Sequence, residues 1–555
     1  MSATLEHALL AAYYAVLCPL ALFGLHRLAL LILLWRADRR AGRPDGSPTS
    51  DHGDPGSAGD WPSVTVQLPV YNEPLVAPRL LHAVGRLDYP PEKLEIQVLD
   101  DSTDETTERL RALLENLRRR GLEVRLLHRD HRHGYKAGAL EAGLAVARGD
   151  LVAVFDADFV PAADFLRRVV PSFADPSVGM VQARWGHLNR RYSLLTRLQA
   201  ILLDGHFLVE HAARAATGRL FNFNGTAGVW RKRAIVEAGG WQHDTLTEDL
   251  DLSYRAQLAG WRFVFLESVV APAELPVELA ALRSQQRRWT RGSAQCLRKL
   301  LRPVLAARLP VATTVEALFH LTSNLAHPLM VALTLLLFPA IWVRHHNGDL
   351  PRTALDLAIL LAATGSLLAF CASAARRAGR SRREVLALQP ALMALGIGMA
   401  WHNARAALGG LVRGGGEFER TPKSCVTDDT AGPGPRRQGP EPRAPRDRSQ
   451  AARRPPLGET LLALYLLACM ATAIAEGIWI ALPFVGLFLA GNLWIVTLAW
   501  GELAHPRETT GLARLSARAA PGCGAAADPR GRAPSEQGSP ATLPRVTSSG
   551  SARAR

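Results

Sequence analysis

The stretch "DLVAVFDADF" (residues 150–159) places a short apolar run directly before two aspartates, Asp156 and Asp158. Three similar runs precede it along the chain: "SVTVQLPVYNE" at 63–73, "LEIQVLDDSTDE" at 94–105 and "LEVRLLHRD" at 122–130. Amphipathic segments of helical length separate these runs. Strands that alternate with helices in this way predict an α/β fold, in which helices cover both faces of a mostly parallel sheet.

Acidic side chains follow two of these predicted strands. Asp100 and Asp101 come after the second, and Asp156 and Asp158 after the fourth. Ligands of such sheets bind at the carboxyl ends of the strands, and two neighbouring carboxylates suit a divalent cation that bridges phosphate oxygens. The residues alone leave simpler interpretations open, because Asp, Ser and Thr also favour helix starts.

Six apolar runs predict a membrane protein. They lie at about 8–35, 314–343, 355–375, 385–411, 460–479 and 480–503. Each is near the roughly 20 residues that a membrane-spanning helix needs. The first run is too long and too poorly terminated for a cleavable signal peptide, so we expect a retained anchor.

Basic segments flank these runs. "RADRRAGR" (36–43) and "RRAGRSRR" (376–383) predict that the polar domain between the first and second runs is cytoplasmic. A full span at 385–411 would place a second arginine-rich stretch on the wrong side of the membrane. That segment also contains polar residues, so it is predicted to be re-entrant or interfacial.

The net charge of +15 does not indicate a nucleic-acid partner. Much of the excess lies in the Pro/Gly/Arg-rich stretch 432–456 and in the tail after Arg507. Such segments are typical of disordered cytoplasmic regions. The isolated cysteines have no C-x-x-C spacing and indicate no zinc site.

The ordered motifs "YNE", "DDSTD", "GYKAGAL", "FDADF", "NFNGTAGVWRK", "TEDLDL" and "QQRRW", followed by apolar runs, resemble the processive family-two glycosyltransferases of the cellulose-synthase superfamily. The resemblance extends from about Trp61 to Arg302 and into the membrane region, and is greatest to the cellulose-synthase-like A group, the glucomannan 4-beta-mannosyltransferases. It implies a nucleotide-sugar-binding domain of the glycosyltransferase A type with about five to six transmembrane helices.

The resemblance also implies roles for particular residues. Asp249, with Glu248 before it, would be catalytic, Asp249 as general base. Asp156 and Asp158 would hold Mg²⁺ or Mn²⁺. Nucleotide-sugar binding is implied for Glu73, Asp100, Asp101, Lys136, Asp156, Thr421 and Lys423. Acceptor or diphosphate binding is implied for Gln285, Arg287, Arg288 and Trp289.

The expected organisation follows from the runs and the resemblance. Residues 1–36 are expected to form an N-terminal transmembrane anchor and 61–310 a glycosyltransferase domain. Residues 311–423 would contain transmembrane or interfacial helices and a loop that covers the nucleotide. The remainder would be a disordered basic linker (424–457), two transmembrane helices (458–504) and a disordered basic tail (505–555).

The function implied is inverting transfer of a hexose from GDP-mannose or UDP-glucose to a growing β-linked polysaccharide. Two alternatives stay open: transfer of a single sugar to a lipid such as a diacylglycerol or ceramide, and a non-catalytic membrane scaffold. We expect a multi-pass protein of a bacterial inner membrane with a cytoplasmic catalytic domain.

Overall fold

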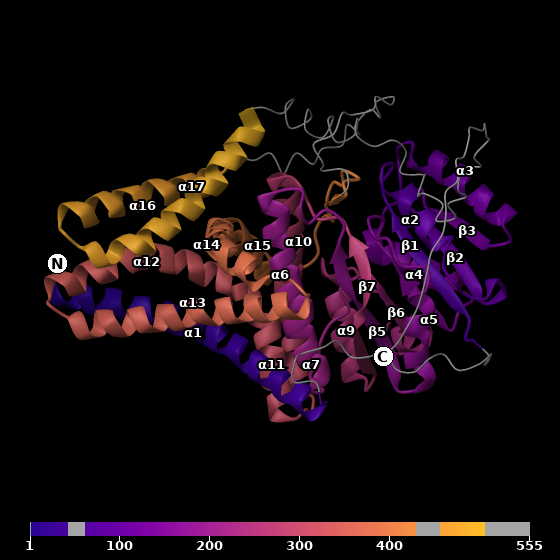
Figure 1. Ribbon diagram of the computed structural model, residues 1–555, viewed down its shortest axis with the longest axis horizontal. Helices are drawn as coiled ribbons and strands as arrows, with labels where there is room; N and C mark the ends of the chain where they lie inside the picture. Colours follow the sequence, from indigo (N-terminus) through magenta and orange to yellow (C-terminus); the bar gives the residue numbers. More distant parts are fainter. Residues whose placement is uncertain (1, 43–60, 429–454, 505–555) are drawn as a thin grey trace, which may run out of the picture.

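The computed structural model describes residues 2–42, 61–428 and 455–504. Figure 1 shows two regions, a bundle of long helices at one end and a sheet with shorter helices at the other. Residues 429–454 of the predicted linker and the whole predicted tail lie outside the described residues.

The sheet contains seven strands: β1 (Val64–Val70), β2 (Leu94–Asp100), β3 (Glu123–His128), β4 (Leu151–Val154), β5 (Val178–His187), β6 (Gly228–Arg231) and β7 (Arg262–Ala273). Their spatial order is β3-β2-β1-β4-β6-β5-β7. β6 is antiparallel to both neighbours, and the other pairs are parallel. The predicted α/β fold with a mostly parallel sheet is therefore confirmed.

Helices cover both faces of this sheet. They are α2 (Ala77–Val84), α3 (Thr106–Arg119), α4 (Tyr135–Val146), α5 (Phe165–Val169), α6 (Leu194–Gly205), α7 (Ala212–Ala216), α8 (Lys232–Glu237) and α9 (Glu248–Leu258), with a π-helical segment, η3 (His206–His211), between α6 and α7. Apolar residues of α2, α3 and α5 form one core with the sheet. Those of α4, α6, α8 and α9 form a second core on the other face. Burial on both faces explains the continuous apolar runs in the sequence.

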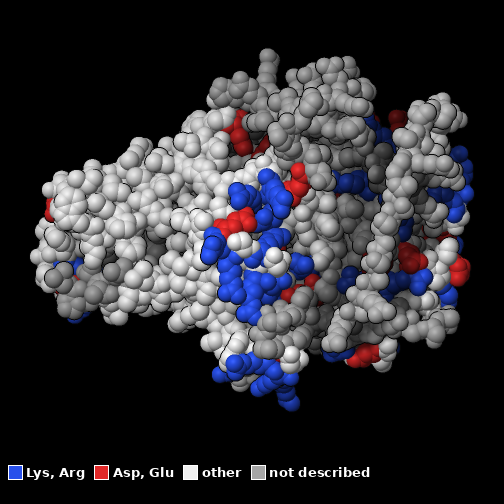
Figure 2. Space-filling view, viewed as in Figure 1, with Lys and Arg blue, Asp and Glu red and all other residues white. Residues whose placement is uncertain are grey.

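The bundle contains α1 (Ala3–Arg40), α11 (Val311–Thr322), α12 (Ala326–His346), α13 (Leu350–Arg377), α14 (Arg382–Gly398), α15 (Ala400–Val412), α16 (Leu457–Ala475) and α17 (Leu482–Ala504). Within the described residues, five helices are long and apolar enough to cross a membrane: Ala3–Arg40, Val311–His346, Ala358–Arg377, Leu457–Ala475 and Trp479–Ala504. On the face shown in Figure 2, few charged side chains lie over this bundle, whereas lysines and arginines gather where it meets the sheet region. This distribution suits an apolar layer around the bundle.

The segment predicted to be re-entrant or interfacial forms the pair α14 and α15. The two helices bend by 45° at their junction. By length and composition the pair is either a broken span or a re-entrant loop, and counting it as a span gives six in the described chain.

A long helix, α10 (Leu279–Ala306), joins the sheet region to the bundle and carries the "QQRRW" motif. It passes close to α15 on one side and to the start of α9 on the other. A Cβ added at Gly410 would meet the carbonyl oxygen of Arg291, and one at Gly292 would lie 2.8 Å from the backbone nitrogen of Thr247. Only glycine permits these approaches, so α10 is held firmly between α9 and the bundle.

Candidate active site

One cleft collects most of the side chains singled out in the sequence. It lies at the carboxyl ends of the parallel strands, where such sheets bind ligands. Its lining includes Glu73, Asp101, Lys136, Asp156, Asp158, Glu248, Asp249, Gln285, Arg288, Trp289, Thr421 and Lys423. Asp100 and Arg287 are the two members of the implied set that do not line it.

The two aspartates of "FDADF" follow β4 and point into this cleft, and each lies beside a lysine. The Lys136 ammonium is 2.6 Å from Oδ1 of Asp156, and the Lys423 ammonium is 2.5 Å from Oδ2 of Asp158. No cluster of three or more His, Cys, Asp or Glu residues that could hold a metal occurs in the described part of the chain. Two carboxylates still fit Mg²⁺ or Mn²⁺, because such ions commonly take one or two carboxylates and complete their shell with phosphate oxygens and water.

Glu248 and Asp249 form the first turn of α9, where the helix dipole favours negative charge. Thr247 occupies the N-cap position but makes no capping bond, and its hydroxyl lies 3.3 Å from the Cys296 sulfur instead. Burial, and next the neighbouring Glu248 carboxylate, raise the pKa of Asp249 to about 7. The position therefore suits a group that exchanges a proton near neutral pH.

The "NFNGTAG" loop packs against this carboxylate through Gly225, which has φ +79°. A Cβ at this position would lie 3.1 Å from Oδ2 of Asp249 and 3.3 Å from the Lys136 ammonium. The carbonyl of Gly225 accepts a hydrogen bond of 2.9 Å from that ammonium. The glycine is needed both for its backbone conformation and for space beside the acid.

The adjacent aspartates after β2 have different surroundings. Asp100 is fully buried, and its carboxylate accepts hydrogen bonds from the Ser102 amide (3.0 Å) and the Thr107 hydroxyl (2.6 Å). Asp101 lines the cleft and pairs with the Arg129 guanidinium at 2.7 and 2.5 Å. Asp100 thus shapes the turn after β2, while Asp101 faces the ligand space.

The loop "EFERTPK" (417–423) reaches over the same cleft. Nη1 of Arg420 is 2.9 Å from Oε2 of Glu73, and Lys423 pairs with Asp158. Burial raises the pKa of Glu73 to about 7, although Arg420 and Lys423 act against this shift. Thr421 is 6% exposed, and its hydroxyl has no hydrogen-bond partner among the described residues. An unpartnered buried hydroxyl in this cleft is available to a ligand.

Successive residues of α10 face different sides. Gln285, Arg288 and Trp289 line the cleft, and the Arg288 guanidinium lies 4.4 Å from the centre of the Phe418 ring. Arg287 points to the opposite side, where it pairs with Glu419 at 2.9 Å. Of the two arginines implied for the diphosphate, the structure brings only Arg288 to the cleft.

Several residues in or beside the cleft received no role from the sequence. Arg129 binds Asp101, and Arg132 lies 3.4 Å from the centre of the Tyr71 ring at the cleft edge. Buried Glu274 accepts a hydrogen bond of 2.7 Å from the Ser424 amide and pairs with Arg79. A signal existed for Arg129 and Arg132, which follow the third predicted strand at its carboxyl end. None existed for Glu274.

The domain that contains this cleft is similar to known proteins. Residues 62–292, which contain its sheet and both acidic motifs, match the model of a family described as "Glycosyltransferase like family 2". These residues therefore resemble a family 2 glycosyltransferase domain. The resemblance seen in the sequence is thereby confirmed, and so is the fold class.

Relatives of this glycosyltransferase domain include enzymes of plants. Glucomannan 4-beta-mannosyltransferase 7 of Arabidopsis thaliana is 44% identical over 250 residues, which are 44% of this chain and 45% of that protein. Glucomannan 4-beta-mannosyltransferase 1 of Oryza sativa subsp. japonica is 41% identical over 321 residues, 56% of this chain and 60% of that protein. The chain spans about half the length of the curated relatives it matches.

Among solved structures, the mannosyltransferase PcManGT from Pyrobaculum calidifontis, in complex with GDP-Man and Mn²⁺, is 25% identical. The match covers 65% of this chain and 97% of that one, with a TM-score of 0.48.

Proposed function

We propose that the protein is a membrane-embedded inverting glycosyltransferase, which transfers a hexose from a nucleotide sugar to a growing β-linked polysaccharide. The observation that carries this proposal is the position of Asp249, a half-buried acid with a pKa near 7, in one cleft with Asp156 and Asp158. The curated relatives are named as glucomannan mannosyltransferases, which favours GDP-mannose over UDP-glucose as the donor.

In this mechanism, the Asp249 carboxylate takes the proton of the acceptor hydroxyl. The hydroxyl oxygen then bonds to the anomeric carbon from the face opposite the leaving group, and the electron pair of the broken bond departs with the diphosphate. Attack from that face converts an α-linked donor into a β-linked product. Glu248 contributes by raising the pKa of Asp249, which makes it a stronger base than an ordinary aspartate.

The remaining cleft residues bind and orient the two substrates. Asp101 and Glu73 would hold the nucleoside end. The unpartnered hydroxyl of Thr421 would donate a hydrogen bond to a phosphate oxygen. Arg288 would neutralise charge on the departing diphosphate. The Trp289 ring lines the same cleft and would stack on the terminal sugar of the acceptor.

Asp156 and Asp158 would hold Mg²⁺ or Mn²⁺ against the diphosphate, where the cation would stabilise charge on the leaving group. Both aspartates must give up their lysine partners to do so. Lys423 then becomes free to contact phosphate oxygens, as the resemblance implies for this loop.

The proposed placement in a membrane rests on the candidate spans and on the basic segments that flank them. Five candidate spans are consistent with an integral membrane protein. The basic segments 36–43 and 376–383 favour a cytoplasmic glycosyltransferase domain.

The test is transfer of label from GDP-mannose and, separately, UDP-glucose by purified protein in lipid vesicles with Mg²⁺ or Mn²⁺. A labelled polymer that β-mannanase degrades supports the proposal with GDP-mannose as the donor. A labelled polymer that β-glucanase degrades would instead indicate UDP-glucose as the donor. A lipid-soluble product with one sugar would refute polymer synthesis. Absence of transfer in both the wild type and Asp249→Asn would refute catalysis altogether.

A further inference from the structure

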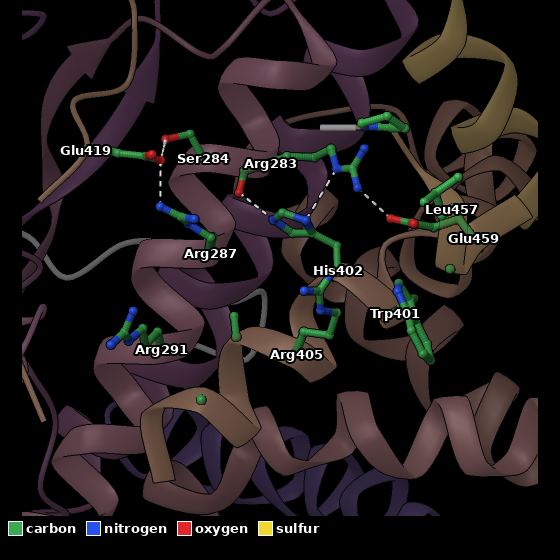
Figure 3. A pocket seen from close by; sticks show the side chains of 14 residues that line it. Arg283, Ser284, Arg287, Arg291, Trp401, His402, Arg405, Glu419, Leu457 and Glu459 are labelled. Carbon is green, nitrogen blue, oxygen red and sulfur yellow. Dashed lines mark hydrogen bonds and ion pairs between the residues drawn. The ribbon is translucent and has the colours of Figure 1, made fainter. Parts of the chain in front are cut away.

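A second cavity lies on the side of α10 that faces away from the cleft. It has a volume of about 430 Å³, within the range of small-molecule sites. Figure 3 shows that α10 contributes Arg283, Arg287 and Arg291, which are spaced one helical turn apart and therefore share one face. α15 contributes Arg405 from the opposite wall, so four guanidinium groups surround one space.

Only two of these four charges are neutralised within the described chain. Arg283 pairs with Glu459 at 2.5 Å, and Arg287 pairs with Glu419 at 2.9 Å. Arg291 and Arg405 have no ion pair among the described residues, and Nε of Arg291 is buried without a hydrogen-bond partner there. Burial, and next the charges of Arg287 and Arg413, lower the pKa of Arg291. An anion in this cavity would relieve the repulsion.

The wall made by α16 places the cavity at the edge of the membrane. Leu457, Gly458 and Glu459 form the first turn of α16 and line the cavity, and α16 is one of the candidate spans. The Trp401 indole packs against Gly458, and aromatic residues with one polar atom favour the level of lipid headgroups. The N-terminus of α16 also favours negative charge at this point.

We propose that this cavity binds the phosphate group of an anionic phospholipid. Guanidinium groups bind phosphate oxygens through paired, charge-assisted hydrogen bonds, and Arg291 and Arg405 have this capacity unused. Phosphate chemistry alone would also admit free phosphate or pyrophosphate. The cavity lies beside the first turn of α16, a candidate membrane span, and this position favours a lipid headgroup over free phosphate or pyrophosphate.

The site connects to the loop that covers the catalytic cleft. Glu419 pairs with Arg287 and accepts a hydrogen bond from the Ser284 hydroxyl at this cavity, while the next residue, Arg420, pairs with Glu73 in the cleft. A phosphate that binds Arg287 competes with Glu419 for the same guanidinium. Lipid binding would therefore loosen one anchor of the loop.

The test measures binding, so it does not depend on the proposed transferase activity. Full-length protein in neutral detergent is titrated with short-chain phosphatidylglycerol, short-chain phosphatidylcholine, inorganic phosphate and pyrophosphate. The double variant Arg291→Ala, Arg405→Ala is compared with Arg382→Ala, Arg383→Ala. The control pair removes the same charge from exposed positions at the start of α14, outside the cavity.

We expect phosphatidylglycerol to bind the wild type and to bind the cavity variant at least about ten-fold more weakly, with the control variant unchanged. The double variant Arg291→Lys, Arg405→Lys should restore part of the affinity, and thermal melting should show that all variants are folded. Equal weakening by the control pair, or no effect of the cavity pair, overturns the site. Pyrophosphate binding that depends on Arg291 and Arg405, without lipid binding, overturns the headgroup as the ligand.

Discussion

The pKa of Asp249 gives the most direct test of the proposed chemistry. A base with a pKa of about 7 is half deprotonated at neutral pH. At pH 6 only about one-tenth is deprotonated, and each further unit of acidification removes about another factor of ten. We therefore expect kcat/KM for transfer to rise about ten-fold per pH unit below neutrality and to level off near pH 8. An ordinary aspartate, with a pKa of about 4, would give a flat profile over the same range.

The assay is initial-rate transfer from labelled donor between about pH 5 and about pH 9, at saturating metal and acceptor. Glu73 has a similarly raised pKa, so Glu73→Gln is the matched control. Glu73→Gln should lower the rate by weakening donor binding, but the rate should still rise with pH below neutrality. Asp249→Asn should lower the rate about 10²–10⁴-fold and abolish the rise of the rate with pH below neutrality. A wild-type profile that is flat from pH 5.5 to pH 8 would refute the assignment of Asp249 as a base with a raised pKa.

The same pKa shift has a consequence for stability that does not require activity. A carboxyl group whose pKa is raised on folding stabilises the protonated folded state and loses that contribution as the pH rises through the folded pKa. Asp249→Asn, which cannot ionise, should therefore gain stability over the wild type as the pH increases from about 4 to about 7. Thermal melting across this range would show the difference grow, and an unchanged difference would indicate an unshifted pKa.

Four further substitutions test residues in and beside the cleft. Asp100→Asn should destabilise the fold by about 1–3 kcal/mol, because the new NH2 group would replace a carboxylate oxygen that accepts a hydrogen bond at a fully buried site; Asp101→Asn should instead raise KM for the donor, as thermal melting and kinetics would show. Gly225→Ala should reduce kcat while nucleotide binding persists, since φ +79° costs an alanine about 1–2 kcal/mol and its Cβ would crowd Asp249; calorimetry with nucleoside diphosphate would separate the two effects. Lys423→Ala should tighten Mn²⁺ binding to the donor-free protein, because the ammonium that competes for Asp158 is gone; unchanged affinity by electron paramagnetic resonance would contradict that competition.

The sequence predicts the first four strands well because their signals are local. Each of the four apolar runs is followed by polar or acidic residues, and strands β1, β2, β3 and β4 form at these runs. No strand was predicted at β5, β6 or β7. Distinctions between neighbouring residues are harder to predict. Asp100 and Asp101 have the same chemistry, and only the folded turn shows that the first is buried among donors while the second faces the cleft.

The covering loop shows why the rest of the cleft could not be predicted from local pattern. Arg420 meets Glu73 across 347 positions of the chain, and Ser424 meets Glu274 across 150. No periodicity links such distant positions. The resemblance pointed to Thr421 and Lys423, but it gave no partner for the neighbouring Arg420.

The "QQRRW" motif has the same ambiguity at closer range. Consecutive residues of a helix point about 100° apart, so Arg287 and Arg288 cannot serve one ligand equally. Arg288 lines the cleft and Arg287 lines the second cavity. α10 is thus a wall shared by two sites, with arginines on both sides. The loop follows the same division, because Glu419 binds on the Arg287 side while Arg420 and Lys423 bind in the cleft. A loop that is anchored in both places would change its hold on one when the other is occupied, which would provide a physical route from the proposed lipid site to the proposed donor site.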